Sequence, residues 1–249
     1  MSKKAQVTIF FIVAIVIVAA VALFFLFRLE KSPFTPSAVE TNPQAFMSNC
    51  IEEEMRTNIN LVLSQGGFIE PLKYHLFDNN KVTYLCYNPG SYAPCTNQHP
   101  MFIQEISKEL NAEITPVIEQ CFNEFETALT KQGYEISIGE YLDTSISLTL
   151  NKVFVDITKD LEITKNQETS TLNDMRLTYL SSLYNLASIA NEIANGESEY
   201  CHFEARGFNI LNPEYSVLVK KMSDSTKIYS IEDEKTKEKM YVATRGCAQ

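Results

Sequence analysis

Six cysteines are the residues of this 249-residue chain whose number and spacing point most directly to a chemistry. An even number of cysteines is typical of a disulfide framework in an exported domain, because thiols in the cytosol are kept reduced. A zinc site usually needs two cysteines separated by two to four residues, and the chain has no such pair. The spacing therefore favours structural disulfides over a metal site or a nucleophilic thiol. The six are Cys50, Cys86, Cys95, Cys121, Cys201 and Cys247.

Proximity in the sequence suggests how these cysteines pair. Cys86 and Cys95 would close a small loop. Cys50 and Cys121 each lie in a predicted helix, so a bridge between them would join helix to helix. Cys201 and Cys247 would then hold the C-terminus. Six thiols can pair in many ways, so this connectivity is a hypothesis. Each bridge would stabilise the folded protein by about 2–4 kcal/mol.

The other reactive side chains do not form a recognisable catalytic motif. The three histidines, His75, His99 and His202, are too scattered for a metal cluster. The acidic runs at 52–54 and 232–234 could bind a divalent cation, but such runs are typical of solvated surface. The nucleophile elbow, the HExxH zinc motif, the P-loop and the dinucleotide-binding fingerprint are all absent. The sequence therefore predicts no catalytic residue, no metal, no cofactor and a protein that is not an enzyme.

The charge of the chain bears on its partners. Its 21 Lys and Arg stand against 31 Asp and Glu, which gives a formal net charge of -10. A nucleic-acid-binding protein would need a basic face. The composition therefore excludes nucleic acid as an expected partner.

Residues 9–27 are an uninterrupted run of 19 apolar residues. As a helix the run would be roughly 28 Å long, close to the hydrocarbon thickness of a bilayer. A cleaved secretory signal peptide usually has a shorter apolar region that ends at a small-residue site, whereas this run leads into Arg28. We therefore expect residues 1–28 to form a short cytoplasmic stub and a single transmembrane helix, with the lipid bilayer as a partner.

Two signals indicate the orientation of this helix. Lys3 and Lys4 precede the run, while Arg28 and Lys31 follow it, so the positive-inside rule favours a cytoplasmic N-terminus only slightly. The stronger signal is that all six cysteines lie beyond the run. The domain that follows the helix is therefore expected outside the cell, at the surface or in a filament.

The residues before the apolar run, Lys3 to Thr8 (KKAQVT), resemble the class III signal peptide of archaeal type IV pilin-like proteins. In that family a prepilin peptidase cuts just before the apolar segment, so the resemblance implies cleavage between Ala5 and Gln6. The retained helix would then bundle subunits in a filament. The chain departs from the family at two positions: Phe10 stands where many pilins carry Glu, and the residue before the cut is Ala5, not Gly.

The chain also resembles a group of uncharacterised single-pass surface proteins of small-genome archaea. These share a start like KKxQVTIF and, further along, a cysteine-containing helix that ends in QGG, as in Cys50 to Gly67 here. This second resemblance implies the same plan, an N-terminal anchor followed by a domain at the cell surface.

Three parts of the chain follow from these patterns. Residues 1–28 carry the anchor, and residues 29–43 contain three prolines with Ser and Thr, which predicts a short stiff linker. Residues 44–249 form the extracytoplasmic domain. Its composition is that of a folded protein, with 45% hydrophobic residues.

Helical and extended segments alternate in the first half of this domain. Apolar residues recur every three or four positions from Gln44 to the glycine pair Gly66-Gly67, which predicts a helix. Residues 68–87 are predicted to be extended. Residues 101–131 return to helical spacing, and Pro116 within them indicates either a kinked helix or two helices that meet there.

In the second half, residues 134–164 alternate apolar and polar side chains, with turns predicted at Asn151 and at Lys159-Asp160. Residues 171–194 have helical spacing. Three strand-like segments follow, at residues 216–220, 227–231 and 240–244. The predicted fold is α+β: a long N-terminal transmembrane helix followed by a disulfide-stapled ectodomain of helices packed on antiparallel sheet.

The function expected from these features is structural. The chain is predicted to be a membrane-anchored cell-surface protein, a pilin-like subunit of a surface filament or envelope assembly that associates with itself or with other envelope proteins. Small residues along the anchor, such as Ala14 and Ala19, would allow helices to approach closely in lipid. One alternative is a non-assembling receptor or adhesin with a ligand groove near the Cys86–Cys95 loop. A second alternative is an extracytoplasmic hydrolase without a recognisable motif.

Overall fold

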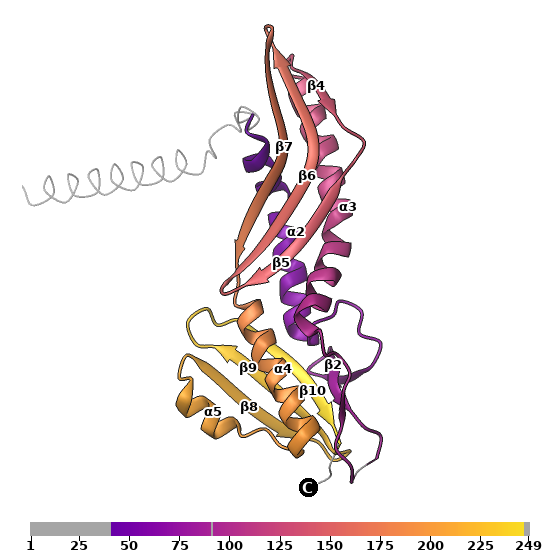
Figure 1. The fold of residues 1–249 in the computed structure, drawn as a ribbon, viewed down its shortest axis with the longest axis vertical. Coiled ribbons are helices and arrows are strands. Elements are labelled where there is room, and N and C mark those ends of the chain that lie inside the picture. The colour runs from indigo at the N-terminus through magenta and orange to yellow at the C-terminus, as the bar shows by residue number, and fades with distance from the viewer. Residues whose placement is uncertain (1–40, 91, 247–249) are drawn as a thin grey trace, which may run out of the picture. The chain divides into compact units, whose positions relative to one another are not determined.

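The computed structural model describes residues 41–90 and 92–246, and the described residues from Asn42 onward form one compact unit. The predicted anchor, the linker up to residue 40, the proposed cleavage site at Ala5 and Gln6, and Cys247 lie outside the described residues. None of the helices in the described part of the chain has the length and hydrophobicity that crossing a bilayer requires. Helices and strands are both present, so the fold of the described unit is α+β (Figure 1).

The helix α2 (Pro43–Gln65) begins and ends at its sequence signals. The side-chain oxygen of Asn42 caps the helix by accepting a hydrogen bond from the N–H of Gln44 at 3.0 Å. Gly66 ends the helix in the left-handed conformation, with φ at +72°. The helix predicted from Gln44 to the glycine pair is therefore confirmed.

Gly67 allows the chain to pass directly against the next helix. Its φ is +103°, a conformation that residues with a side chain rarely adopt. A Cβ atom at this position would also overlap the ring of Phe102, the first residue of α3 (Phe102–Thr130). The glycine pair therefore both ends α2 and lets the chain lie close to α3.

The helix α3 continues without a break through Pro116, so the two-helix alternative is excluded. The hydroxyl of Thr115 donates to the carbonyl oxygen of Asn111 at 2.7 Å, next to the proline, which has no N–H to donate. The buried residues of α3 recur every three or four positions along one face. This face packs against α2, so the two helices form the centre of one half of the domain.

Two disulfides lie within the described residues. One joins Cys50 on α2 to Cys121 on α3, which are 71 residues apart in the sequence. The other joins Cys86 to Cys95, which are nine residues apart. These are the pairs that the spacing suggested. Cys201 is also disulfide-bonded, and its suggested partner, Cys247, lies outside the described residues.

A four-stranded antiparallel sheet packs on the long helices (Figure 1). Its central strand, β6, pairs with β7 along its whole length, while β4 and β5 pair with its two halves in turn. Alternate β6 residues such as Val153 and Val155 are buried against the helices, as the pleat of a strand requires. The strands are β4 (Glu135–Ile138), β5 (Asp143–Thr149), β6 (Lys152–Lys165) and β7 (Glu168–Leu180).

Two predictions for this region are wrong. The turn predicted at Lys159-Asp160 is instead part of β6, where the pairing with β7 shifts its register between Thr158 and Leu161. A bulge of this kind interrupts the alternation of side chains without ending the strand. The break in the sequence pattern therefore marked an irregularity within one strand.

The helix predicted over residues 171–194 is the second error. Its first part is the end of β7, and the helix α4 (Leu183–Tyr200) begins only after Ser181-Ser182. The apolar residues of β7 also alternate, and its threonines favour a strand because branching at Cβ suits extended backbone. Helical spacing alone could not distinguish the end of β7 from the helix α4 that follows it.

A six-stranded sheet forms the other half of the domain, with the main order β1-β2-β10-β9-β8 and β3 paired to β2. The sheet is mixed, because β10 runs parallel to β2 and antiparallel to β9. The antiparallel prediction therefore holds only for the four-stranded sheet. The strands are β1 (Tyr74–Phe77), β2 (Asn80–Tyr87), β3 (Thr96–Asn97), β8 (Tyr215–Lys221), β9 (Thr226–Asp233) and β10 (Lys239–Arg245).

The two faces of the six-stranded sheet pack differently. The face toward α4 joins the main hydrophobic core, which is continuous with the core under α2 and α3. The opposite face, which we call the outer face, has a small separate cluster around Val82, Tyr84 and Ile228. A short helix, α5 (Ala205–Leu211), follows α4 and lies beside β8.

Candidate functional site

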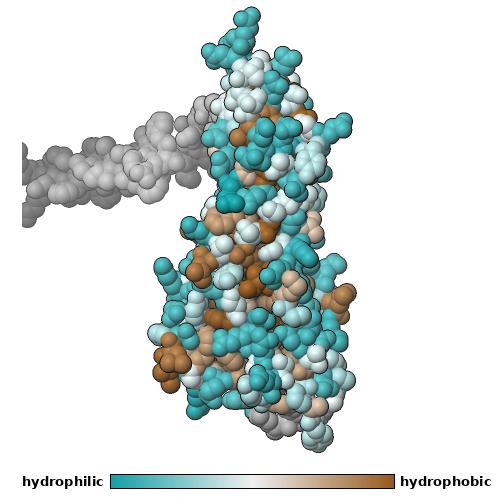
Figure 2. All heavy atoms as spheres, viewed as in Figure 1, coloured by the Kyte–Doolittle hydropathy of each residue, from teal (hydrophilic) through white to brown (hydrophobic). Residues whose placement is uncertain are grey.

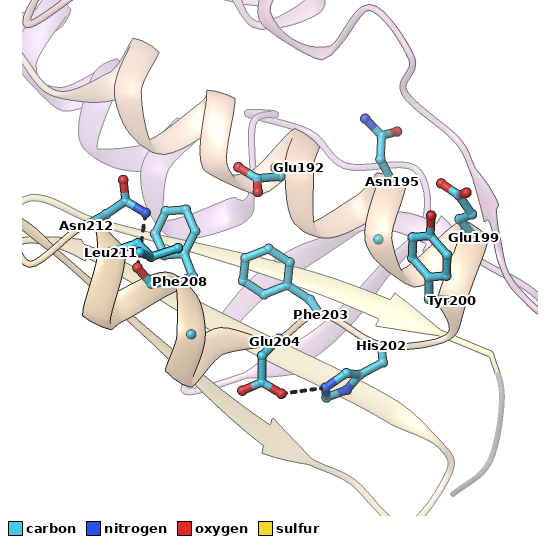
Figure 3. A pocket seen from close by; sticks show the side chains of 12 residues that line it. Glu192, Asn195, Glu199, Tyr200, His202, Phe203, Glu204, Phe208, Leu211 and Asn212 are labelled. Carbon is cyan, nitrogen blue, oxygen red and sulfur yellow. Dashed lines mark hydrogen bonds and ion pairs between the residues drawn. The ribbon is translucent and has the colours of Figure 1, made fainter.

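A groove of about 750 Å³ lies between the second half of α4 and α5 (Figure 3). Its floor is aromatic: Phe203 is 9% exposed, and the ring of Phe208 lies 5.6 Å from it, centroid to centroid. Tyr200 and Leu211 line the groove but are largely exposed. The groove therefore offers apolar surface that solvent can reach.

The rim of the groove carries negative charge. Glu192 and Glu199 on α4 and Glu204 before α5 are exposed lining residues, and the lining contains no Lys or Arg. A hydrogen bond from His202, with another from the backbone N–H of Gly207, holds the pKa of Glu204 below its usual value. Glu204 is therefore a carboxylate at neutral pH. The site can accept a ligand that is both apolar and cationic.

A buried ion pair fixes the end of α4 beneath the groove. Lys227 on β9 donates to both carboxylate oxygens of Glu197 on α4, at 2.9 and 2.7 Å, and each residue is at most 5% exposed. The hydroxyl of Tyr229 donates to the same carboxylate. Burial, together with the charge of Glu197, raises the pKa of Tyr229 above its usual value, so the phenol keeps its proton.

The same lysine also holds the turn that leads into the groove. Cys201 ends α4 in the left-handed conformation, and its carbonyl oxygen accepts a hydrogen bond from Lys227 at 2.8 Å. Two residues later, the ring of Phe203 meets Tyr229 edge-on, with centroids 6.2 Å apart. The ion pair, the disulfide at Cys201 and this ring contact together position the floor of the groove.

The other wall, α5, covers part of the free edge of β8. The side chain of Asn209 accepts from the N–H of Val217 at 2.9 Å and donates to its carbonyl oxygen at 3.1 Å, as a neighbouring strand would. This arrangement leaves Ile210 and Leu211 at the end of α5 80% and 81% exposed. Figure 2 shows hydrophobic side chains gathered on the surface over α5. Exposed apolar groups that lie together beside a groove are typical of an interaction surface.

The three histidines do not come together. His75 hydrogen-bonds the hydroxyl of Tyr84 at 3.2 Å, and His99 lies 2.6 Å from Glu105. His202 is the one histidine that lines the groove, and it contacts Glu204. In the described residues, no group of three or more His, Cys, Asp or Glu side chains has an arrangement that could hold a metal ion.

The two acidic runs have different surroundings. Glu52 lies on α2 and forms an exposed ion pair with Arg56 at 2.8 Å. Glu232 pairs with Lys239 at 2.8 Å, whereas Asp233 is buried next to the start of α4. There the hydroxyl of Ser182 donates to Asp233 at 2.6 Å. The second run therefore joins the turn between β9 and β10 to α4.

The buried carboxylate predicts a dependence of stability on pH. Burial alone would raise the pKa of Asp233, but hydrogen bonds from Ser182 and from the backbone N–H groups of Thr236 and Lys235 outweigh it and lower the pKa below its usual value. A carboxyl whose pKa is lowered by folding stabilises the folded protein at pH values above its pKa in the unfolded chain. This contribution is lost as the pH falls through its pKa in the folded protein. We therefore expect Asp233→Asn to cost about 1–3 kcal/mol at pH 7.

The difference between wild type and Asp233→Asn should begin to shrink as the pH falls below about 4, where Asp233 of the unfolded wild type takes up its proton, and should disappear below the pKa of the folded protein, where both proteins carry a neutral side chain. Urea denaturation of the full chain at pH 7 and at pH 3 measures it. A difference that is equal at both pH values would show that the charge of Asp233 is not what stabilises the turn.

Sequence reasoning placed a possible ligand groove near the Cys86–Cys95 loop. The groove between α4 and α5 uses no residue of that loop, whereas a smaller pocket of about 400 Å³, lined by Tyr84 and Gln98, lies next to it. The seven-residue helix α5 was not predicted, because it is too short to show a period. The one available signal was the cluster of aromatic and acidic residues at 199–204. No protein-family model, curated protein or solved structure matches this chain.

Proposed function

We propose that this chain is a membrane-anchored cell-surface protein that acts through protein–protein contacts, as a pilin-like subunit of a surface filament or envelope assembly. In this proposal residues 9–27 anchor the chain and the described domain makes the contacts. The apolar run and the resemblance of residues 3–8 to a class III signal peptide support the anchor. The disulfides support an oxidising exterior.

The observation that carries the proposal is the apolar surface at α5. Ile210 and Leu211 are about four-fifths exposed beside a groove with an aromatic floor. Such a surface is unfavourable in water, and it resembles the apolar centre of a protein interface, with charged residues at its rim. A contact with another protein would bury it.

The construction of the domain suits a subunit that presents a fixed surface. The disulfide between Cys50 and Cys121 joins the two longest helices, and the four-stranded sheet packs along them. At the groove, the ion pair between Glu197 and Lys227 holds α4 to the six-stranded sheet. The α4 wall of the groove therefore rests on a buried polar contact, and the two longest helices on a covalent bond.

A receptor or adhesin is the second candidate, and the volume of the groove favours it. About 750 Å³ is within the range of sites that bind small molecules. A small ligand in this groove would combine an apolar body with a positive charge. Binding of such a ligand by a protein that stays monomeric in its membrane would favour the receptor over the filament subunit.

Processing and location of the native protein test the proposal. We expect the chain to stay in the membrane fraction after an alkaline carbonate wash, and its mature N-terminus to begin at Gln6. N-terminal sequencing measures this, and electron microscopy of cells labelled with antibody against the domain should show filaments or a surface layer. An intact Met1 or Ser2 would contradict pilin-like processing. A freely soluble cytosolic chain with reduced thiols would contradict the whole proposal.

A further inference from the structure

The six-stranded sheet presents opposite charges on its two sides. Side chains of β9 alternate between them: Lys227 and Tyr229 point toward α4, and Ile228 between them points to the outer face. The acidic groove therefore lies on the α4 side of the sheet. A surface on the outer face cannot reach it within the same copy of the chain.

The outer face is aromatic and carries cations. The ammonium group of Lys73 lies 4.1 Å from the ring centre of Tyr87, and that of Lys220 lies 4.9 Å from the ring centre of Phe77. Arg245 lies 5.8 Å from Tyr87. Cations held over ring faces keep their charge exposed while their stems cover apolar surface. We call Lys73, Lys220, Arg245 and the two rings the cationic face.

Asp224 interacts electrostatically with Arg245 and His75, and Glu70 and Glu109 line a pocket together with Lys73. Among the described residues, none of the three cations of this face forms an ion pair within 4.0 Å. In a chain with a net charge of -10, a positive surface is not expected from composition. Leu218, which is 64% exposed on the same side of β8, adds apolar surface next to Lys220.

The groove complements this face in both charge and chemistry. Its three carboxylates, Glu192, Glu199 and Glu204, surround an aromatic floor and have no Lys or Arg among them. Complementary charges set the register of two surfaces, and the apolar groups between them supply most of the binding. The cationic face has the cations, the aromatic rings and the exposed leucine that such a groove would accept.

We propose that the cationic face of one copy docks on the acidic α4–α5 groove of a second copy. Lys73 and Lys220 would lie against Glu192 and Glu199, and Leu218 would cover the exposed end of α5. Two different surfaces on opposite sides of one sheet make a head-to-tail contact, which continues from copy to copy as an open chain. The inference rests on the proposed function as an assembly subunit and names the surfaces that the subunit uses.

Charge reversal on each surface tests this contact with the full chain in a mild detergent. The variant Lys73→Glu/Lys220→Glu makes the cationic face acidic, and the variant Glu192→Lys/Glu199→Lys makes the groove basic. All four residues are exposed, and none belongs to the buried Glu197 network. We expect each variant alone to associate at least tenfold more weakly than wild type, because its two surfaces then carry like charges.

An equimolar mixture of the two variants should restore association, because every head-to-tail contact between unlike copies again joins opposite charges. Sedimentation velocity over a range of concentrations measures both results, and circular dichroism checks that each variant is folded. As a matched control, Glu113→Lys/Glu119→Lys on α3 changes the charge by the same amount at two exposed positions that belong to neither surface. This control should associate like wild type.

Zero-length cross-linking supplies a second readout. In a mixture of unlabelled and 15N-labelled wild-type chains, we expect cross-links between copies from Lys73 or Lys220 to Glu192, Glu199 or Glu204. A mixture that stays monomeric, or variants that associate as strongly as wild type, would overturn the docking contact. Membrane fractionation and N-terminal sequencing test the proposed function independently of association. A membrane-bound chain that begins at Gln6 but does not associate would therefore overturn this contact and leave the proposed function standing.

Discussion

Replacing Lys227 with Met is expected to lower the free energy of unfolding by about 3–5 kcal/mol. Lys227 and Glu197 are 5% and 2% exposed, so the variant leaves a carboxylate buried without its cation. It also removes the hydrogen bond to the carbonyl oxygen of Cys201, which holds the turn into the groove. Urea denaturation of the full chain, followed by tyrosine fluorescence, measures the change.

Two controls separate the buried charge from the loss of packing. In the double variant Glu197→Gln/Lys227→Met no charge remains, so we expect most of the lost stability to return. Lys237→Met removes the lysine of a pair with Glu234, whose nitrogen–oxygen distance is 2.5 Å. Both side chains of this pair are 45% or more exposed, so this variant should cost far less stability than Lys227→Met. If Lys227→Met costs no more than Lys237→Met, the buried pair does not hold α4 to the sheet.

Removing the disulfide between α2 and α3 is expected to have an effect of similar size. The bond between Cys50 and Cys121 closes a loop with a sequence separation of 71, which corresponds to about 4 kcal/mol of lost chain entropy in the unfolded state. The bond between Cys86 and Cys95 has a separation of nine and corresponds to about 3 kcal/mol. Replacing both members of each pair with Ala avoids new free thiols.

Guanidinium denaturation of the two double variants measures these costs. The loop-entropy argument predicts that Cys50→Ala/Cys121→Ala is the less stable of the two. The reverse order would mean that local contacts around the Cys86–Cys95 loop matter more than loop length. Peptide mapping without reduction is the accompanying check, and finding all six thiols free in the native protein would remove the basis of both predictions.

Regular periodicity made much of the fold predictable. The helix ending at Gly66, the long helix through Pro116 and the three C-terminal strands all lie within a few residues of their predicted positions. Each has a long run of one period or a clear stop signal, and each buries the face that the period defines. Local sequence suffices where one pattern extends over several turns or along a whole strand.

The errors lie where two sequence patterns both fit, or where pairing with a distant strand determines the structure. In residues 171–180, helical and alternating spacing both fit, and pairing with β6 selects the strand. The mixed six-stranded sheet depends on a parallel pair between β2 and β10, which are far apart in the sequence. No local pattern indicates which strand becomes the neighbour of another.

The candidate site was predictable only in part. Its carboxylates and aromatic residues are visible between residues 192 and 211, but the groove exists because Cys201 turns the chain and α5 returns beside α4. The partnership of Glu197 with Lys227 joins residues 30 positions apart. A sequence shows which charges are present, whereas their pairing depends on how α4 crosses the sheet.

The position of β10 has a consequence for the order of events during synthesis. This strand is the last of the described strands, yet it lies between β2 and β9 in the middle of the six-stranded sheet. β2 therefore has no neighbour on that side until residues 239–245 have been made. The helical half can assemble as it emerges, whereas the half that carries the groove must wait, and a stop codon shortly before residue 239 would leave β2 and β9 without their common partner.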